Sequence, residues 1–127
     1  MALSRNLNVV SIAASGDLST NQFRIVAVDD SGQIAVQAGS GTMPVGVLLN
    51  KPAAAGRAGR VAITGSVVKC EAGAAINERD PIQAVAGGRG SAAAQGTNVM
   101  FVGYAHTAAS GSGVLFELLV QPGRGVQ

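Results

Sequence analysis

The sequence is poor in the residues that build large aromatic cores. It has no tryptophan, one tyrosine and three phenylalanines, so aromatic residues occupy 3% of its 127 positions. Apolar residues still make up 47% of the chain, carried mainly by alanine, valine, isoleucine and leucine. Because aromatic side chains bury the most apolar area per residue, stability is expected from many small contacts, sheet hydrogen bonds or partner subunits. This composition favours a component of an oligomer or a larger assembly.

Charge is also sparse, with nine lysines and arginines against seven acidic residues and a net charge of +2. The basic residues are scattered, and their densest stretch, Lys51 to Arg60, contains no aromatic residue to stack on bases. We therefore expect no nucleic-acid partner. No apolar run approaches the roughly 20 residues needed to cross a bilayer, and the start of the chain lacks a signal-peptide pattern. The sequence predicts a soluble protein made in the cytoplasm, with no membrane partner.

The residues of reactive sites are nearly absent. Cys70 and His106 are each the single residue of their type, which excludes an intrachain disulfide and a thiolate zinc cluster. We expect Cys70 to be a buried structural thiol and His106 to be structural or solvent-facing. The acidic residues near Asp29 and Asp80 lack the spacing of a calcium loop, and Gly87 to Gly90 lacks the Lys-Ser/Thr of a phosphate-binding loop. The sequence predicts no catalytic residue, metal site, cofactor or enzymatic activity.

Short runs rich in valine and isoleucine alternate with glycine, aspartate, asparagine and serine, a pattern typical of an all-β chain. It predicts one small, mainly β domain of the barrel or sandwich kind over residues 9–121. An extended N-terminal arm over residues 1–8 precedes it. A tail over 122–127 follows, where Pro122, Gly123 and Gly125 should stop any strand. The expected strands are Val9–Ala14, Phe23–Val28, Gln33–Ala38, Pro44–Leu49, Arg60–Thr64, Val67–Glu71, Ile82–Val85, Val99–His106 and Val114–Val120.

Local signals refine this pattern. A hairpin is expected over Phe23–Ala38, because Asp29 to Gly32 supplies turn-forming residues. Residues 72–78 could form a short helix or a loop. The glycine-rich stretches 39–41, 87–90 and 110–113 are expected to be flexible connections. Glu117 lies in an apolar run and either faces solvent or lies at an interface; the cost of burying a carboxylate favours solvent.

The chain also resembles itself at a spacing of 57 residues without a gap. Met43-Pro44-Val45-Gly46 is echoed by Met100-Phe101-Val102-Gly103, among ten identities whose first members lie between Gly16 and Gly56. Such a repeat suggests two related β-units around one shared core of small residues. Gly46 and Gly103 lie inside apolar runs, where glycine marks a bulge or the close approach of another backbone.

The order of several short motifs resembles the capsid decoration, or cement, proteins of tailed phages. These motifs are Gly16-Asp17, a hairpin, Val45-Gly46-Val47, a glycine-rich loop, Gly65–Val68, Ala72–Ala75, Asp80–Ile82 and a second Val-Gly step. The resemblance covers residues 9–120. The sequence departs from the family where Arg79-Asp80 replaces the common Gly-Asp, so the turn there is expected to differ.

The resemblance implies a non-enzymatic virion protein on the outer capsid surface, commonly a homotrimer that clamps adjacent subunits of the major capsid protein. It also implies a role for the N-terminal arm, which could add a strand to an exposed edge of the shell. The arm residues expected to contact a partner are Ala2, Leu3, Ser4, Arg5, Asn6 and Leu7. Alternatives are another phage structural module, such as a tail or spike β-domain, and a small ligand-binding β-domain, which the scarcity of exposed aromatics disfavours.

Overall fold

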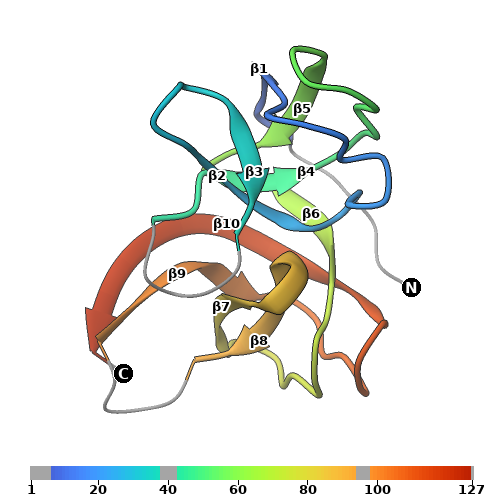
Figure 1. The fold of residues 1–127 in the computed structure, drawn as a ribbon. Helices are drawn as coiled ribbons and strands as arrows, with labels where there is room; N and C mark the ends of the chain where they lie inside the picture. The colour runs from blue at the N-terminus through green and yellow to red at the C-terminus, as the bar shows by residue number, and fades with distance from the viewer. Residues whose placement is uncertain (1–6, 38–42, 94–97, 127) are drawn as a thin grey trace.

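The computed structural model describes residues 7–37, 43–93 and 98–126, and within them the chain is almost entirely β-structure. Two antiparallel five-stranded sheets pack together as a sandwich (Figure 1). The first sheet is ordered β1-β5-β4-β2-β3 and contains β1 (Val9–Ala13), β2 (Ile25–Val28), β3 (Ile34–Val36), β4 (Gly46–Leu48) and β5 (Ala58–Ala62). The second sheet is ordered β6-β10-β9-β7-β8 and contains β6 (Val67–Glu71), β7 (Pro81–Val85), β8 (Arg89–Ala92), β9 (Asn98–Ala105) and β10 (Leu115–Val126).

The expected all-β class is confirmed in its sandwich form. Neither sheet closes into a barrel within the described ranges. Each curls enough that its edges meet at one isolated parallel bridge, Ala14 to Ile34 in the first sheet and Ala72 to Gly90 in the second. The strands that sequence pattern predicts all exist, with ends shifted by a few residues, and β6 lies where it is predicted.

The two sheets are copies of one unit. Their strand orders correspond one to one, and every residue pairing between strands of the first sheet recurs in the second. The spacing between equivalent residues is 58 for β1 and β6, 56 for the hairpins β2–β3 and β7–β8, and 57 for β4–β5 and β9–β10. The repeat suggested by the sequence is therefore a structural duplication.

The constant spacing of 57 expected from the sequence is wrong in detail. The second copy is two residues shorter before its second strand and one residue longer before its fourth. Met43/Met100, Val45/Val102, Gly46/Gly103 and Gly56/Gly113 remain equivalent, whereas the identities between β2–β3 and β7–β8 do not. Ile25, for example, corresponds to Pro81, because these residues pair with the equivalent residues Val47 and Tyr104.

Unusual backbone conformations are duplicated too. Phe23 and Arg79 hold equivalent positions and have positive φ angles of 65° and 69°, which non-glycine residues rarely adopt. The turn at Arg79-Asp80 thus keeps a glycine-like conformation although it carries arginine. Gly56 and Gly113 have φ angles of 84° and 85°, and their amides donate equivalent 2.8 Å hydrogen bonds to the carbonyls of Ala14 and Ala72.

Gly46 and Gly103 confirm the expected close approach of another backbone. A β-carbon on Gly46 would overlap the carbonyl oxygen of Ala62, and one on Gly103 would overlap that of Leu119. Ala62 and Leu119 are themselves equivalent residues. Both copies therefore require glycine at this point for the same reason.

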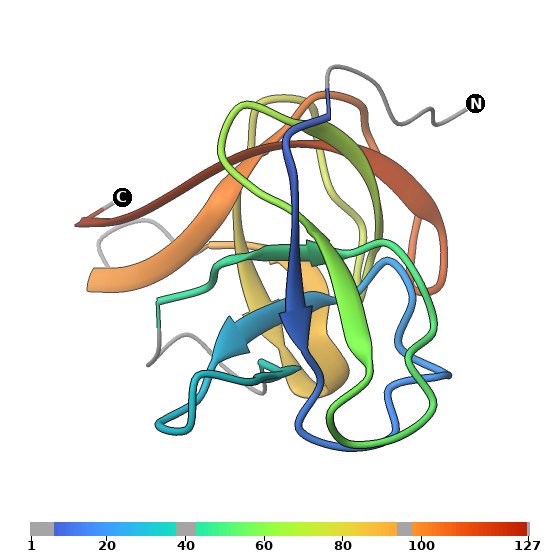
Figure 2. The same ribbon diagram turned by 90° about the horizontal axis from the view of Figure 1, so that it is seen from above.

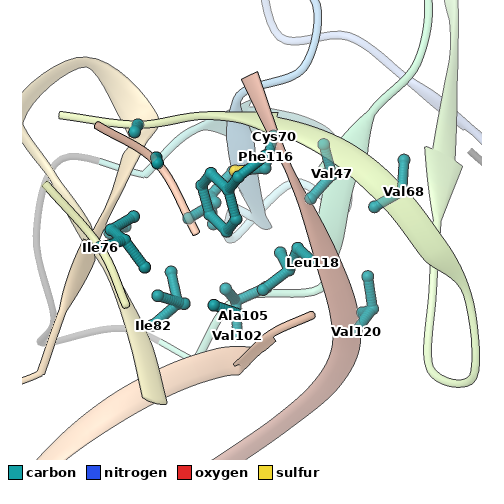
Figure 3. Close-up of a cluster of buried hydrophobic side chains, with 14 of the residues drawn as sticks. Val47, Val68, Cys70, Ile76, Ile82, Val102, Ala105, Phe116, Leu118 and Val120 are labelled. Carbon is teal, nitrogen blue, oxygen red and sulfur yellow. The ribbon is translucent and has the colours of Figure 1, made fainter. Parts of the chain in front are cut away.

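The buried side chains form two clusters. One fills the first copy and contains Ala14, Leu18, Val26, Ile34, Leu48 and Val61. The other fills the second copy and reaches the first sheet through Ile25, Val47 and Ala62 (Figure 3). The single shared core of small residues expected from the repeat is therefore wrong in two respects: each copy has its own cluster, and the largest buried side chains include Phe116, Ile34 and Leu118. The second cluster nevertheless joins the two copies, because it contains residues of both.

Two local expectations need revision, and one open alternative is settled. Residues 89–92 form strand β8, so the 87–90 stretch is not simply a flexible connection; Gly87 and Gly88 make its turn. Pro122, Gly123 and Gly125 do not stop the last strand, because β10 continues to Val126 through a shift in register between Val120 and Gly123. Figure 2 shows β10 as a long curved strand beside β9. Residues 72–78 form bends and a turn, so of the two alternatives the loop is correct.

Other local expectations are confirmed. The hairpin β2–β3 turns through Asp29–Gly32, where Asp29 Oδ1 accepts hydrogen bonds from the amides of Ser31 and Gln33. Residues 111–113 form a bend and a turn between strands, so the 110–113 stretch is a connection, and its flexibility stays a prediction. Ala38 and the 39–41 stretch lie outside the described residues.

Candidate interaction surfaces

The N-terminal arm is the first candidate, and the described part of the chain begins near its end. Of the arm residues expected to contact a partner, Ala2, Leu3, Ser4, Arg5 and Asn6 lie outside the described residues. Leu7 is described and is 43% exposed, which is high for a leucine. Its side chain is thus available to a partner.

The residue after Leu7 is firmly anchored. The Asn8 amide donates a 2.8 Å hydrogen bond to Ser66 Oγ, and this hydroxyl donates back to the Asn8 carbonyl at 3.1 Å. The same carbonyl accepts from the Ile63 amide, and Asn8 Nδ2 donates to the Thr64 carbonyl. The root of the arm is therefore fixed to the segment that connects the two copies.

An ionic cluster joins the copies at another point. Glu71 Oε2 accepts from Arg89 Nε at 2.7 Å and from Arg24 Nη2 at 3.3 Å, and Arg24 Nη1 donates to the Gly87 carbonyl. The Glu71 amide also donates to the Phe23 carbonyl. Arg24 comes from the first copy, and Glu71 and Arg89 come from the second. The cluster therefore stabilises the packing of one sheet against the other. Sequence reasoning missed it, since the three residues are far apart in the chain.

Glu117 is buried, so the expectation that it faces solvent is wrong. Its side chain is 4% exposed, with Oε1 lying 3.9 Å from Nε2 of the half-exposed His106. The cross-strand neighbour of Glu117 is Lys69. The backbone amide of Glu117 donates a 2.9 Å hydrogen bond to the hydroxyl of Thr107, which fixes this part of β10. His106 faces solvent, one of its two expected placements.

Cys70 is fully buried, as expected. Burial raises the pKa of its thiol to about 12, and the neighbouring Glu71 carboxylate adds to the rise. A thiol with this pKa is protonated at neutral pH and is a poor nucleophile. Cys70 therefore acts as a small apolar side chain, beside Phe116 in the core (Figure 3).

Exposed apolar side chains stand out on the surface. They are Leu7, Val10, Val28, Met43, Val114 and Leu115, each between 36% and 44% exposed. A shallow hollow of about 350 Å³ lies elsewhere on the second copy, lined by Arg79, Tyr104, Ala105, His106 and Leu119. The exposed side chains offer apolar contact, and the hollow adds the polar groups of Arg79, Tyr104 and His106. Among the described residues, no three metal-ligating side chains gather in one place.

Comparison with known proteins gives no further assignment. No protein-family model matches the sequence, and no curated protein matches it either. Within the described ranges, none of the helical segments is long and apolar enough to span a membrane.

Proposed function

We propose that this protein is a capsid decoration protein, which binds the outer surface of an assembled phage head and stabilises contacts between major capsid subunits. The proposal starts from the resemblance of the sequence to phage cement proteins. It is supported by one structural observation: a duplicated β-sandwich whose arm root, Asn8, is bonded to the connection between the copies. A folded body that holds the root of an arm by hydrogen bonds suits a clamp, because force on the arm reaches both sheets through the connection between them.

The arm supplies the attachment in this proposal. Residues 2–7 would pair as an added strand with an exposed sheet edge of the shell, so that main-chain hydrogen bonds give affinity and side chains give register. A homotrimer would engage three such edges at once, and linked contacts raise the overall affinity far above that of one arm. No catalysis is involved.

The direct test is the location and effect of the protein on virions. Purified protein is added to heads that lack it, the heads are sedimented, and their structure is reconstructed by electron microscopy. Density on the outside of the shell, together with greater resistance of the heads to heat, is the expected result. Density on the tail would favour the alternative of a tail or spike module. Protein that never sediments with heads or virions would overturn the proposal.

A further inference from the structure

The outer face of the first sheet is covered by the second copy. Ile25, Val47 and Ala62 are cross-strand neighbours on β2, β4 and β5, and each is 0% exposed. They belong to the buried cluster that fills the second copy (Figure 3). The second copy thus completes its own core with a surface of the first.

The equivalent face of the second sheet has no such cover among the described residues. Pro81, Tyr104 and Leu119 occupy the positions of Ile25, Val47 and Ala62, as the strand pairings establish. All three are only partly buried, and Tyr104 and Leu119 line the shallow hollow beside His106. We call Pro81, Tyr104 and Leu119 the open face.

The surface of the second copy that covers this face of the first sheet also has an equivalent in the first copy. In the second copy, Val68 on β6 and Ala84 on β7 are 0% and 2% exposed and lie in the same cluster as Val47. Their equivalents in the first copy are Val10 and Val28, which are 36% and 42% exposed. We call Val10 and Val28 the open mouth of the first copy.

The two copies therefore pack head to tail and not through a two-fold axis. A two-fold contact would bury the same surface of each copy, whereas here the face of one copy is covered by the mouth of the other. Among the described residues, one mouth and one face of each chain stay uncovered, and these are the equivalents of two surfaces that already fit together.

We propose that a second copy of this chain docks its open mouth, Val10 and Val28, onto the open face, Pro81, Tyr104 and Leu119. Repeating a head-to-tail contact closes a ring when the rotation permits. Such a ring would alternate first and second copies of the unit. The inference does not rest on the capsid role, since it concerns the chain alone.

The proposed contact between chains differs from the contact between copies within a chain in its charged residues. Within a chain, Arg24 of the first copy pairs with Glu71 of the second copy. In the contact between chains, the equivalent of Arg24 is Asp80 of the second copy, and the equivalent of Glu71 is Ala13 of the first copy. The ion pair is therefore not reproduced. Apolar contact would dominate, and the Val10 and Val28 positions would face a tyrosine and a leucine. We expect the contact between chains to be weaker than the one within a chain and to depend on concentration.

Sedimentation velocity of the purified full chain across a concentration series tests this contact. The wild type should associate, while Val10→Asp and Leu119→Asp should each weaken association more than tenfold, because a charge would be buried without a partner. Val114→Asp is the matched control, since Val114 is also 36% exposed but belongs to neither surface. If Val10→Asp or Leu119→Asp melts at a lower temperature than the wild type, Val28→Asp and Tyr104→Asp replace them as the variants of the mouth and the face.

Mixing the two variants tests the head-to-tail geometry itself. The Val10→Asp chain keeps an intact face and the Leu119→Asp chain keeps an intact mouth, so the mixture should form 1:1 pairs that do not grow. A two-fold contact predicts no such rescue, and absence of the pairs would overturn the proposal. It would also be overturned by a wild type that stays monomeric.

Discussion

Gly59 lies directly against Ile34: a β-carbon at position 59 would come within 2.5 Å of Ile34 Cδ1. In the second copy the sizes are exchanged, because Gly90 holds the Ile34 position and Phe116 holds the Gly59 position. A β-carbon on Gly90 would lie 3.1 Å from Phe116 Cζ. Each interior thus pairs a glycine with a large side chain at this place. The glycine is on the fifth strand in the first copy (Gly59 against Ile34) and on the third strand in the second copy (Gly90 against Phe116).

This relationship predicts coupling between the two positions. Gly59→Ala should destabilise the protein by about 1–3 kcal/mol through overpacking. Ile34→Val alone should cost about 0.5–1.5 kcal/mol, but it removes the atom with which the new methyl collides. The double variant should therefore be about 1 kcal/mol more stable than the sum of the single effects predicts. Urea denaturation of the four proteins measures this coupling, and simple additivity would contradict it.

Gly46 and Gly103 should be equally intolerant of substitution. Alanine at either position would drive a β-carbon into a backbone carbonyl oxygen, which cannot move aside as a flexible side chain can. We expect each variant to lose more than about 2 kcal/mol of unfolding free energy. Gly16→Ala is the control, because a β-carbon there would have nothing within 4 Å, and stability should change by less than about 0.5 kcal/mol. Equal melting temperatures for all three variants would refute this account.

The fold was predictable where local pattern decides it. Valine-rich runs such as Val67–Glu71 and turn residues such as Asp29–Gly32 act through backbone preferences that the sequence displays. Strand β8 was not predictable in this way, because Arg89-Gly90-Ser91-Ala92 has a low strand propensity and is held by pairing with β7. The extension of β10 past Pro122 likewise depends on its partner β9.

The candidate surfaces were less predictable, for a physical reason. Whether Val10 is exposed and Val68 buried depends on how the copies pack, although both are valines in equivalent strands. The burial of Glu117 is a tertiary effect of the same kind. The useful signal in the sequence was the repeat, but an ungapped spacing of 57 misaligns the hairpins and hides the equivalence of Ile25 with Pro81.

The buried thiol predicts a loss of stability at alkaline pH. In the folded protein the pKa of Cys70 is about 12, raised from 9.0, so the unfolded chain loses this proton first as the pH rises. The contribution is constant below pH 9 and falls by about 1.4 kcal/mol per pH unit between the two pKa values. Urea denaturation from about pH 8 to about pH 11 should show a steeper decline for the wild type than for Cys70→Ala. Parallel pH profiles would contradict the assignment.

The Glu71 cluster predicts a dependence of stability on one carboxylate. Glu71→Ala removes the ion pairs of both Arg24 and Arg89, and Arg24 is left with its side chain only 15% exposed. We expect a loss of about 1–3 kcal/mol, because a mostly buried charge loses its partner. Glu78→Ala is the control, since Glu78 is exposed. A double-mutant cycle with Arg24→Ala should give a favourable coupling, and a coupling of zero would assign the loss to packing alone.

The arm predicts a separation of folding from attachment. Removing residues 1–7 leaves Asn8 and its bonds to Ser66 in place, so the unfolding free energy should change by less than about 0.5 kcal/mol. Attachment to heads should nevertheless weaken more than tenfold in a co-sedimentation assay, because the added strand and its hydrogen bonds are gone. Ser66→Ala keeps the arm but releases its root from the buried hydroxyl, and it should weaken attachment to a smaller degree. Unchanged occupancy in the deletion would remove the arm from the mechanism and leave the folded sandwich as the only attachment surface.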